Sequence, residues 1–79
     1  MDVARLQRRR LRLGALLFRL RYYMLAPADV AANIYRRSPD DYIQVDGAAA
    51  TLVSARGSTI LTIDEAIDWC KEKLKDAPR

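Results

Sequence analysis

Two residue types that support much of enzyme and metal chemistry are missing or scarce: the chain has no histidine and one cysteine, Cys70, in 79 residues. Histidine is the commonest general base and the commonest metal ligand. One cysteine cannot form a disulfide within the chain, and no metal cluster can be built around it. We therefore expect a protein that is not an enzyme, that binds no cofactor or metal ion, and that resides in the reducing cytoplasm.

Glycine-rich loops and long apolar runs are also lacking. The three glycines stand apart, so no loop of the phosphate-binding type is present. Arg19 and Arg21 interrupt the longest apolar stretch, which argues against a secretory signal and excludes a spanning helix of about 20 apolar residues. Residues 3–25 share the arginine-rich, acid-poor composition of a mitochondrial presequence, but they contain no serine. We expect this segment to remain part of the folded protein.

Charge is distributed unevenly along the chain. Residues 1–37 contain nine Arg, no Lys and two Asp, which gives a net charge of +7. Residues 38–79 contain five basic and eight acidic residues, which gives −3. Such asymmetry indicates either an acidic partner for the first half or contact between copies of the chain.

The first segment, 3–25, has the periodicity of a long amphipathic helix with Asp2 at its N-cap. One side of this helix carries an apolar stripe of Leu6, Leu13, Leu17, Leu20 and Met24. Another side carries a basic stripe of Arg5, Arg8, Arg9, Arg12 and Arg19. Gly14 is the weak point of the helix, because glycine costs up to about 1 kcal/mol relative to alanine.

The remaining elements follow from turn and capping signals. Pro27 begins a short helix over 27–37, and the alternating pattern over 41–61 predicts three antiparallel strands with a hairpin at Asp46-Gly47. Thr62 and Glu65 form a capping box before a C-terminal helix over 63–76. We therefore predict one α+β domain over residues 1–79, with the order α-α-β-β-β-α and a three-stranded antiparallel sheet packed against the helices. The predicted core comprises Leu13, Leu17, Leu20, Ile34, Ile43, Val45, Leu52, Ile60, Ile63, Ile67, Cys70 and Leu74.

The carboxylates do not form a candidate catalytic or metal-binding pair. Asp40 and Asp41 lie in a predicted turn, Asp46 in a hairpin, and Asp64 and Glu65 at a helix start, so each has a local structural role. Cys70 falls on the apolar side of the last helix, where we expect an inert core thiol.

The candidate functional residues are basic and aromatic and come from the first half of the chain. Guanidinium groups bind carboxylate and phosphate bidentately and carry a permanent charge. Such a surface suits an acidic protein, a nucleic-acid backbone or anionic lipid, and it can also be a solvated helix side. We expect an acidic protein surface, with nucleic acid as the alternative. The predicted partner-binding residues are Arg5, Arg8, Arg9, Arg12, Arg19, Tyr22, Arg36 and Arg37.

Three further interpretations of the sequence bear on function. Helix 3–25 and the short helix after it resemble the start of a helix-turn-helix, but only Asn33, Arg36 and Arg37 would be available to read bases.

Leu11, Leu16 and Phe18 lie partly off the apolar stripe and need cover, which predicts a homo-oligomer or a structural subunit of an assembly. In size, charge and lack of catalytic groups, the chain resembles small basic proteins that phages encode as inhibitors of host machinery, which implies a regulator or inhibitor.

Overall fold

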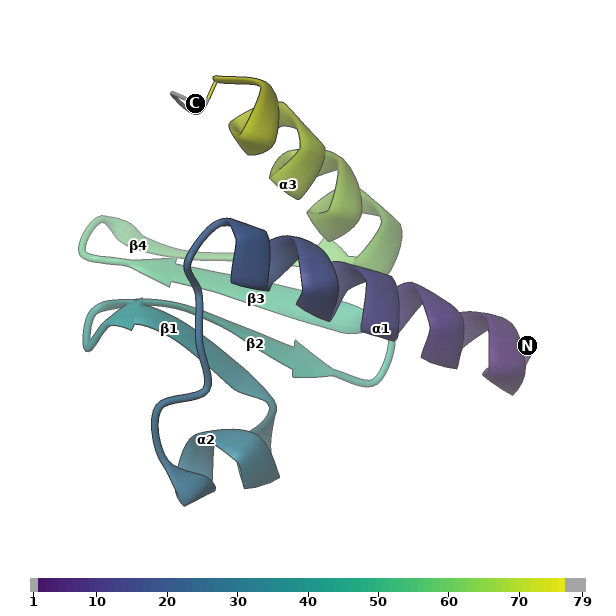
Figure 1. Cartoon of the computed structure of the whole chain (residues 1–79), viewed down its shortest axis with the longest axis horizontal. Helices are drawn as coiled ribbons and strands as arrows, with labels where there is room; N and C mark the ends of the chain where they lie inside the picture. Colours follow the sequence, from purple (N-terminus) through teal and green to yellow (C-terminus); the bar gives the residue numbers. More distant parts are fainter. Residues whose placement is uncertain (1, 77–79) are drawn as a thin grey trace.

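The computed structural model describes residues 2–76 and shows three helices and a four-stranded antiparallel sheet (Figure 1). Their order is α-α-β-β-β-β-α, and the strands are neighbours in sequence order, β1-β2-β3-β4. The elements are α1 (Val3–Arg19), α2 (Pro27–Ala32), β1 (Ile34–Ser38), β2 (Asp41–Asp46), β3 (Ala49–Ser54), β4 (Gly57–Thr62) and α3 (Ile63–Asp76). The predicted α+β class is confirmed, and the predicted number of strands was wrong by one.

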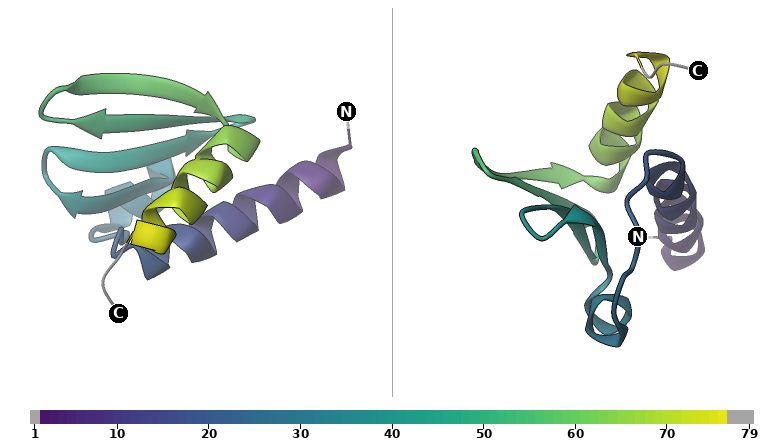
Figure 2. Two further views of the ribbon diagram at one scale, coloured as in Figure 1. Left: turned by 90° about the horizontal axis from the view of Figure 1, so that it is seen from above. Right: turned by 60° about the vertical axis from the view of Figure 1, so that its left-hand side comes forward.

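Helices α1 and α3 pack against each other on one face of the sheet (Figure 2). They run in the same general direction, so that the C-terminal ends of both helices lie at the same end of the molecule. The core fills the space between the two helices and the sheet. Its largest fully buried side chains are Leu13, Leu17, Ile43, Ile67 and Cys70.

Helix α1 is shorter than the predicted 3–25, because the chain reverses at Arg21 with a left-handed φ of 69°. The Tyr22 amide donates to the Leu17 carbonyl at 2.9 Å, and the Arg21 amide donates to the Phe18 carbonyl at 3.0 Å. This pair of bonds is a Schellman motif, which normally has glycine at the left-handed position. The sequence carries no glycine there, so the end of the helix was not recognisable.

The second half of the predicted helix 27–37 is strand β1. Helix α2 ends at Asn33, which takes a left-handed φ of 55°, and asparagine is a common residue at such a position. The chain then becomes extended, and Tyr35 pairs with Ile43 of β2. The Arg36 backbone also pairs with Tyr23, a residue outside the named strands. These long-range partners override the helical pattern of 27–37.

Ile60 was wrongly predicted to lie in the core and is 73% exposed. Its pairing partner on β3 is Thr51, which is one residue out of phase with the buried Ala50. Successive side chains of a strand point to opposite faces. Ile60 therefore lies on the sheet face opposite the helices, and Leu61, the partner of Ala50, packs against the core.

Two local predictions are confirmed. Gly47 turns the chain between β2 and β3 with a left-handed φ of 57°. The hydroxyl of Thr62 accepts from the Glu65 amide at 3.1 Å, and the Glu65 carboxylate accepts from the Thr62 amide at 2.9 Å. This reciprocal pair fixes the start of α3, the helix that completes the core.

We expect Thr62→Ala to lower the free energy of unfolding by about 1 kcal/mol, because the Glu65 amide loses its acceptor. In a domain of this size, a loss of that magnitude lowers the melting midpoint by roughly 4 to 8 °C. Thermal unfolding followed by circular dichroism measures the change. The control is Thr59→Ala, at an exposed position of β4. Equal midpoints for the two variants would contradict the capping role of Thr62.

Candidate functional site

Four of the five arginines predicted as a basic stripe on α1 are exposed: Arg5, Arg8, Arg12 and Arg19. From here on, we restrict the name basic stripe to these four residues and leave out Arg9. None of them forms an ion pair with a carboxylate within residues 2–76. Their charges are therefore not neutralised by the described part of the chain, and all four guanidinium groups are available to an anionic partner.

Arg9 is placed differently from its neighbours in the sequence. Its Nε donates to Asp64 Oδ1 at 2.8 Å, and Asp64 is in the first turn of α3. Arg9 is half-buried, whereas Asp64 is largely exposed. The Arg9–Asp64 pair thus links α1 to α3, and a partner that binds Arg9 has to compete with this contact.

An exposed apolar strip lies on α1 beside the basic stripe. It consists of Leu11, Ala15 and Phe18, which follow one another at spacings of four and three and therefore share one side of the helix. Leu11 is 74% and Phe18 is 46% exposed. The Phe18 ring stacks on Tyr23 at a centroid distance of 6.1 Å, which extends the apolar strip beyond the end of α1.

The sequence had marked Leu11, Leu16 and Phe18 as residues in need of cover, and the structure separates them. Leu16 is buried in the core, whereas Leu11 and Phe18 are exposed. These two also line a shallow pocket of about 450 Å³ between α1 and the β1–β2 side of the sheet, with Tyr35 on its far wall. The sequence therefore indicated correctly that α1 carries apolar side chains outside its main stripe. The helical pattern alone could not show that Leu16 is the one that lies in the core.

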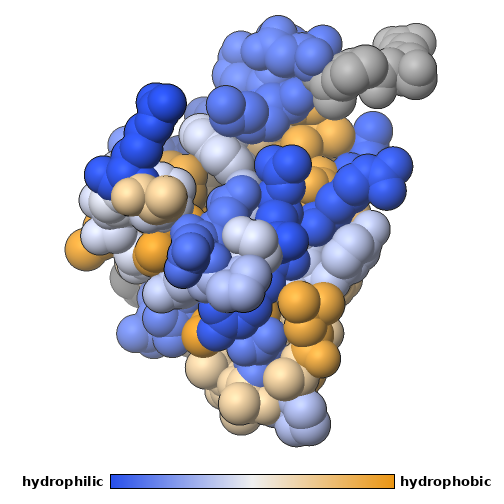
Figure 3. Space-filling view, turned by 90° about the vertical axis from the view of Figure 1, so that its left-hand side faces the viewer, coloured by the Kyte–Doolittle hydropathy of each residue, from blue (hydrophilic) through white to orange (hydrophobic). Residues whose placement is uncertain are grey.

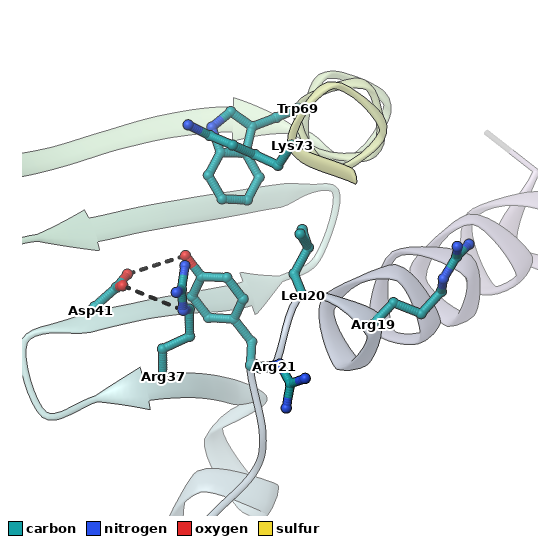
Figure 4. Close-up of a pocket in the computed structure, with 8 residues that line it drawn as sticks. Arg19, Leu20, Arg21, Arg37, Asp41, Trp69 and Lys73 are labelled. Carbon is teal, nitrogen blue, oxygen red and sulfur yellow. Dashed lines mark hydrogen bonds and ion pairs between the residues drawn. The ribbon is translucent and has the colours of Figure 1, made fainter. Parts of the chain in front are cut away.

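A larger pocket of about 670 Å³ lies where α1 and α3 end (Figure 4). It is lined by Arg19, Leu20, Arg21, Tyr22, Arg37, Asp41, Trp69 and Lys73. Four of these residues are cationic and one is acidic. Figure 3 shows the end of the molecule that carries the β1–β2 and β3–β4 turns, where hydrophilic side chains predominate and leave smaller apolar areas between them.

Part of this positive charge has a structural explanation. Carbonyl groups at the C-terminal end of a helix carry partial negative charge, which favours cations in the last turn. Arg19 occupies that position in α1, and Lys73 occupies it in α3, where its Nζ lies 5.7 Å from the centre of the Trp69 ring. The pocket consequently has a net positive lining, but its cations do not converge on one point, since Arg19 lies on α1 well away from Asp41 (Figure 4).

Asp41 organises the wall of this pocket formed by the sheet. Its carboxylate accepts from the Tyr22 hydroxyl at 3.2 Å and lies 4.0 Å from Arg37 Nε. The Arg37 guanidinium also lies over the Tyr22 ring, 5.4 Å from its centre. Burial is the main cause that raises the pKa of Tyr22, and the hydrogen bond with Arg37 opposes it. Arg37 is exposed but already engaged in these contacts.

Tyr22 itself lies in the core rather than on the surface. It is 4% exposed and meets Trp69 edge to face at 6.2 Å. The sequence placed Tyr22 among the candidate partner-binding residues because it lies between Arg19 and Arg21, off the main apolar stripe. The reversal at Arg21 turns Tyr22 inward, so its ring is not available for stacking in an interface.

Arg36 is committed to a contact inside the molecule. Its Nε lies 3.1 Å from Asp29 Oδ1 and 3.2 Å from Asp29 Oδ2. Asp29 is 5% exposed and also accepts from the Leu25 amide at 3.3 Å. The guanidinium covers the Tyr42 ring at 4.7 Å. Arg36 thus neutralises a buried carboxylate and joins α2 to β1, and we do not include it in the proposed binding surface.

Cys70 is fully buried, and burial raises the pKa of its thiol to about 11. A neutral, inaccessible thiol is a poor nucleophile. No group of three or more potential metal ligands occurs among residues 2–76.

We expect Cys70 to react slowly with a thiol reagent in the native protein and rapidly in denaturant. Because the thiol pKa is raised in the folded state, the unfolded state ionises first as the pH rises. The free energy of unfolding should then decrease as the pH rises from 9.0, the ordinary pKa of the thiol, to about 11, its pKa in the folded protein. Labelling kinetics followed by mass spectrometry test the accessibility. Equal labelling rates with and without denaturant would place Cys70 at the surface.

Within residues 2–76 no helix combines the length and the apolar character that crossing a membrane requires. No known protein family, no curated protein sequence and no solved structure matches this chain.

Proposed function

We propose that this protein is a non-enzymatic regulator or inhibitor that acts by binding a second protein through α1. The observation that carries the proposal is the side-by-side position of the basic stripe and the apolar strip on the solvent side of one helix. Arg8 and Leu11 are three residues apart, as are Arg12 and Ala15, so cationic and apolar groups alternate across a continuous surface. We place this binding in the cytoplasm, because the only cysteine in the chain cannot form an internal disulfide.

The apolar strip favours a protein over a nucleic acid. Phosphate contacts need cations and hydrogen-bond donors, and they gain nothing from Leu11, an apolar side chain that is 74% exposed. Protein interfaces, in contrast, combine an apolar centre with arginine and aromatic residues. Phe18 and Tyr23 supply two stacked aromatic rings at one end of the surface, and Arg8 and Arg12 supply charge along its middle. The matching partner has an apolar ridge flanked by carboxylates.

We expect Arg8, Arg12, Leu11 and Phe18 to dominate the binding energy. Residues at the centre of an interface, where water is excluded, typically cost about 2 kcal/mol or more on truncation, whereas charges at the rim cost little. Arg5 lies one turn outside the apolar strip, and Arg9 is held by Asp64, so both should contribute less. This ranking distinguishes a defined interface from general attraction between opposite charges.

A synthetic peptide provides a direct test. The probe is a helical peptide with leucines along one side and glutamates beside them, compared with a scrambled peptide of the same composition and with duplex DNA. We expect the amphipathic peptide to bind at least about tenfold more tightly than the scrambled one, since only the former presents an apolar ridge. Fluorescence anisotropy at several salt concentrations measures each affinity.

Two matched pairs of variants complete the experiment. Arg12→Ala should weaken binding of the amphipathic peptide, whereas Arg56→Ala, which removes an exposed arginine in the β3–β4 turn, should not. Phe18→Ser should weaken binding of the amphipathic peptide and leave the affinity for DNA unchanged. Equal affinity for the two peptides would refute a defined protein interface.

Nucleic acid remains the second candidate because the basic stripe has no carboxylate partner among residues 2–76. If DNA is the true partner, affinity falls linearly with the logarithm of salt concentration. Four phosphate contacts imply a slope of roughly −3 to −4. A slope of that size, together with no effect of Phe18→Ser, would favour this candidate over a protein.

A further inference from the structure

The two edges of the sheet differ in how they are protected. The outer edge of β1 is occupied, because the Arg36 amide donates to the Tyr23 carbonyl at 2.7 Å and the Tyr23 amide donates to the Arg36 carbonyl at 2.8 Å. Strand β1 also carries a register irregularity between Arg36 and Ser38. Charge, irregularity and a covering segment are common means by which proteins block an edge strand. All three are present at β1.

Strand β4 has none of these protections. Gly57–Thr62 contains no charged residue and no proline, pairs with β3 in unbroken register, and is exposed along most of its length. No other strand of residues 2–76 lies beyond it. An exposed, uncharged and regular edge strand is a template for pairing with another strand.

The register identifies the peptide groups that remain open. Ser54 and Gly57 flank a two-residue turn, so they form a hydrogen-bonded pair, and bonded and non-bonded pairs then alternate along the ladder. Thr59 and Leu61 bond to β3, whereas Ser58, Ile60 and Thr62 point their peptide groups away from it. The Thr62 amide already donates to the Glu65 carboxylate at 2.9 Å. The open stretch is therefore the short segment around Ser58 and Ile60.

We propose that two copies of this chain pair through β4, antiparallel and about a two-fold axis at Thr59, to form a continuous eight-stranded sheet. In this register Ser58 of each copy bonds Ile60 of the other, which satisfies the open peptide groups of both strands. A two-fold pair requires a self-complementary surface, and an uncharged strand meets that condition without repulsion. Ile60, 73% exposed in one chain, then packs beside the facing strand.

Charge complementarity selects a second copy as the occupant. The same register brings the β3–β4 turn of one chain, which carries Arg56, to the end of the other chain's β4, beside Thr62 and the Glu65 carboxylate that caps it. Arg56 is exposed and forms no ion pair within residues 2–76. The two-fold axis repeats this contact, so that each end of the β4 pair brings one arginine and one glutamate together. This inference does not depend on the proposed function of α1, which uses another surface.

Sedimentation equilibrium and amide hydrogen exchange of the full chain test the pairing together. We expect a dimer at high micromolar concentration, with the Ser58 and Ile60 amides exchanging more slowly than in dilute protein. Ile60→Lys adds a charge to an already exposed position and should raise the dimer dissociation constant about tenfold or more. Arg56→Glu should weaken the dimer as well, because it places two acids together.

Leu11→Ser is the control, because it alters the apolar strip on α1 and leaves β4 intact. A dimer that survives Ile60→Lys but is lost with Leu11→Ser would overturn the proposal and assign self-association to α1. A monomer at every concentration would overturn it too. Circular dichroism of each variant confirms that the fold is retained before these results are compared.

Discussion

Replacing Leu17 by alanine is expected to lower the free energy of unfolding by about 3 kcal/mol. Leu17 is fully buried on α1 in the core between the helices and the sheet, where removal of one methine and two methyl carbons leaves a cavity. A domain of 79 residues has a total stability of roughly 4 to 12 kcal/mol. The loss is therefore a large fraction of the whole, and the melting midpoint should fall by well over 10 °C.

Leu11→Ala provides a matched control, with the same chemical change on the same helix. Leu11 is 74% exposed, so its truncation should change the free energy of unfolding by no more than about 0.5 kcal/mol. Urea denaturation followed by Trp69 fluorescence and by circular dichroism measures both variants. If Leu17→Ala unfolds at the same urea concentration as Leu11→Ala, the assignment of the buried side of α1 is incorrect. The control variant also tests function, because it should weaken binding of the amphipathic peptide without loss of stability.

Replacing Asp29 by alanine is expected to cost about 2 kcal/mol. The buried carboxylate accepts hydrogen bonds from Arg36 and from the Leu25 amide, and its loss leaves the guanidinium without its partner. Removing one member of a fully buried ion pair costs more, but Arg36 is partly open to water, which reduces the penalty. The expected structural effect is loosening of α2 and of the contact between Tyr23 and β1.

A double-mutant cycle separates the ion pair from other effects. Asp29→Ala, Arg36→Ala and the combination should be non-additive, with the double variant more stable than the sum of the single losses predicts. Asp40→Ala, in the exposed β1–β2 turn, is the control and should leave stability nearly unchanged. Additive losses from Asp29 and Arg36 would show that the two side chains do not act together. Urea denaturation at constant pH is the appropriate measurement.

The predictable parts of the fold are those specified by neighbouring residues. The capping box of Thr62 and Glu65 and the turn at Gly47 depend on contacts within a few positions, and both occur as expected. The C-terminal ends of α1 and α2 depend instead on left-handed residues at Arg21 and Asn33. Arginine is unusual at such a position, so nothing in the local sequence indicated where α1 ends.

Long-range strand pairing explains the other differences between the predicted and the observed fold. Strand β1 exists because Tyr35 and its neighbours pair with β2 and because Tyr23 covers the outer edge, and neither partner is evident from the pattern of 27–37. Ile60 and Leu61 are equally apolar neighbours, and the register with β3 decides which one faces the helices. A shift of one residue exchanges the two faces of a strand. Composition alone cannot resolve that choice.

The same distinction applies to the candidate surface. The exposed arginines of α1 follow from helical periodicity, since they lie away from the leucines of the core. Tyr22 was included because of its place between two arginines and Arg36 because of its charge, and the fold uses both inside the molecule: Tyr22 packs against Trp69, and Arg36 neutralises Asp29. The partners of an arginine are set by tertiary structure, so its availability cannot be predicted from sequence.

The packing of α1 against α3 also determines when the chain can fold during synthesis. Residues 3–19 are synthesised before residues 63–76, so the apolar side of α1 has to wait for the helix against which it packs. Until then the leucines of α1 remain open to solvent beside a dense row of arginines. Contacts between distant segments form late because the intervening loop must first be closed. We therefore expect this domain to fold only after residues 63–76 have left the ribosome, with the nascent α1 segment exposed to chaperones until then.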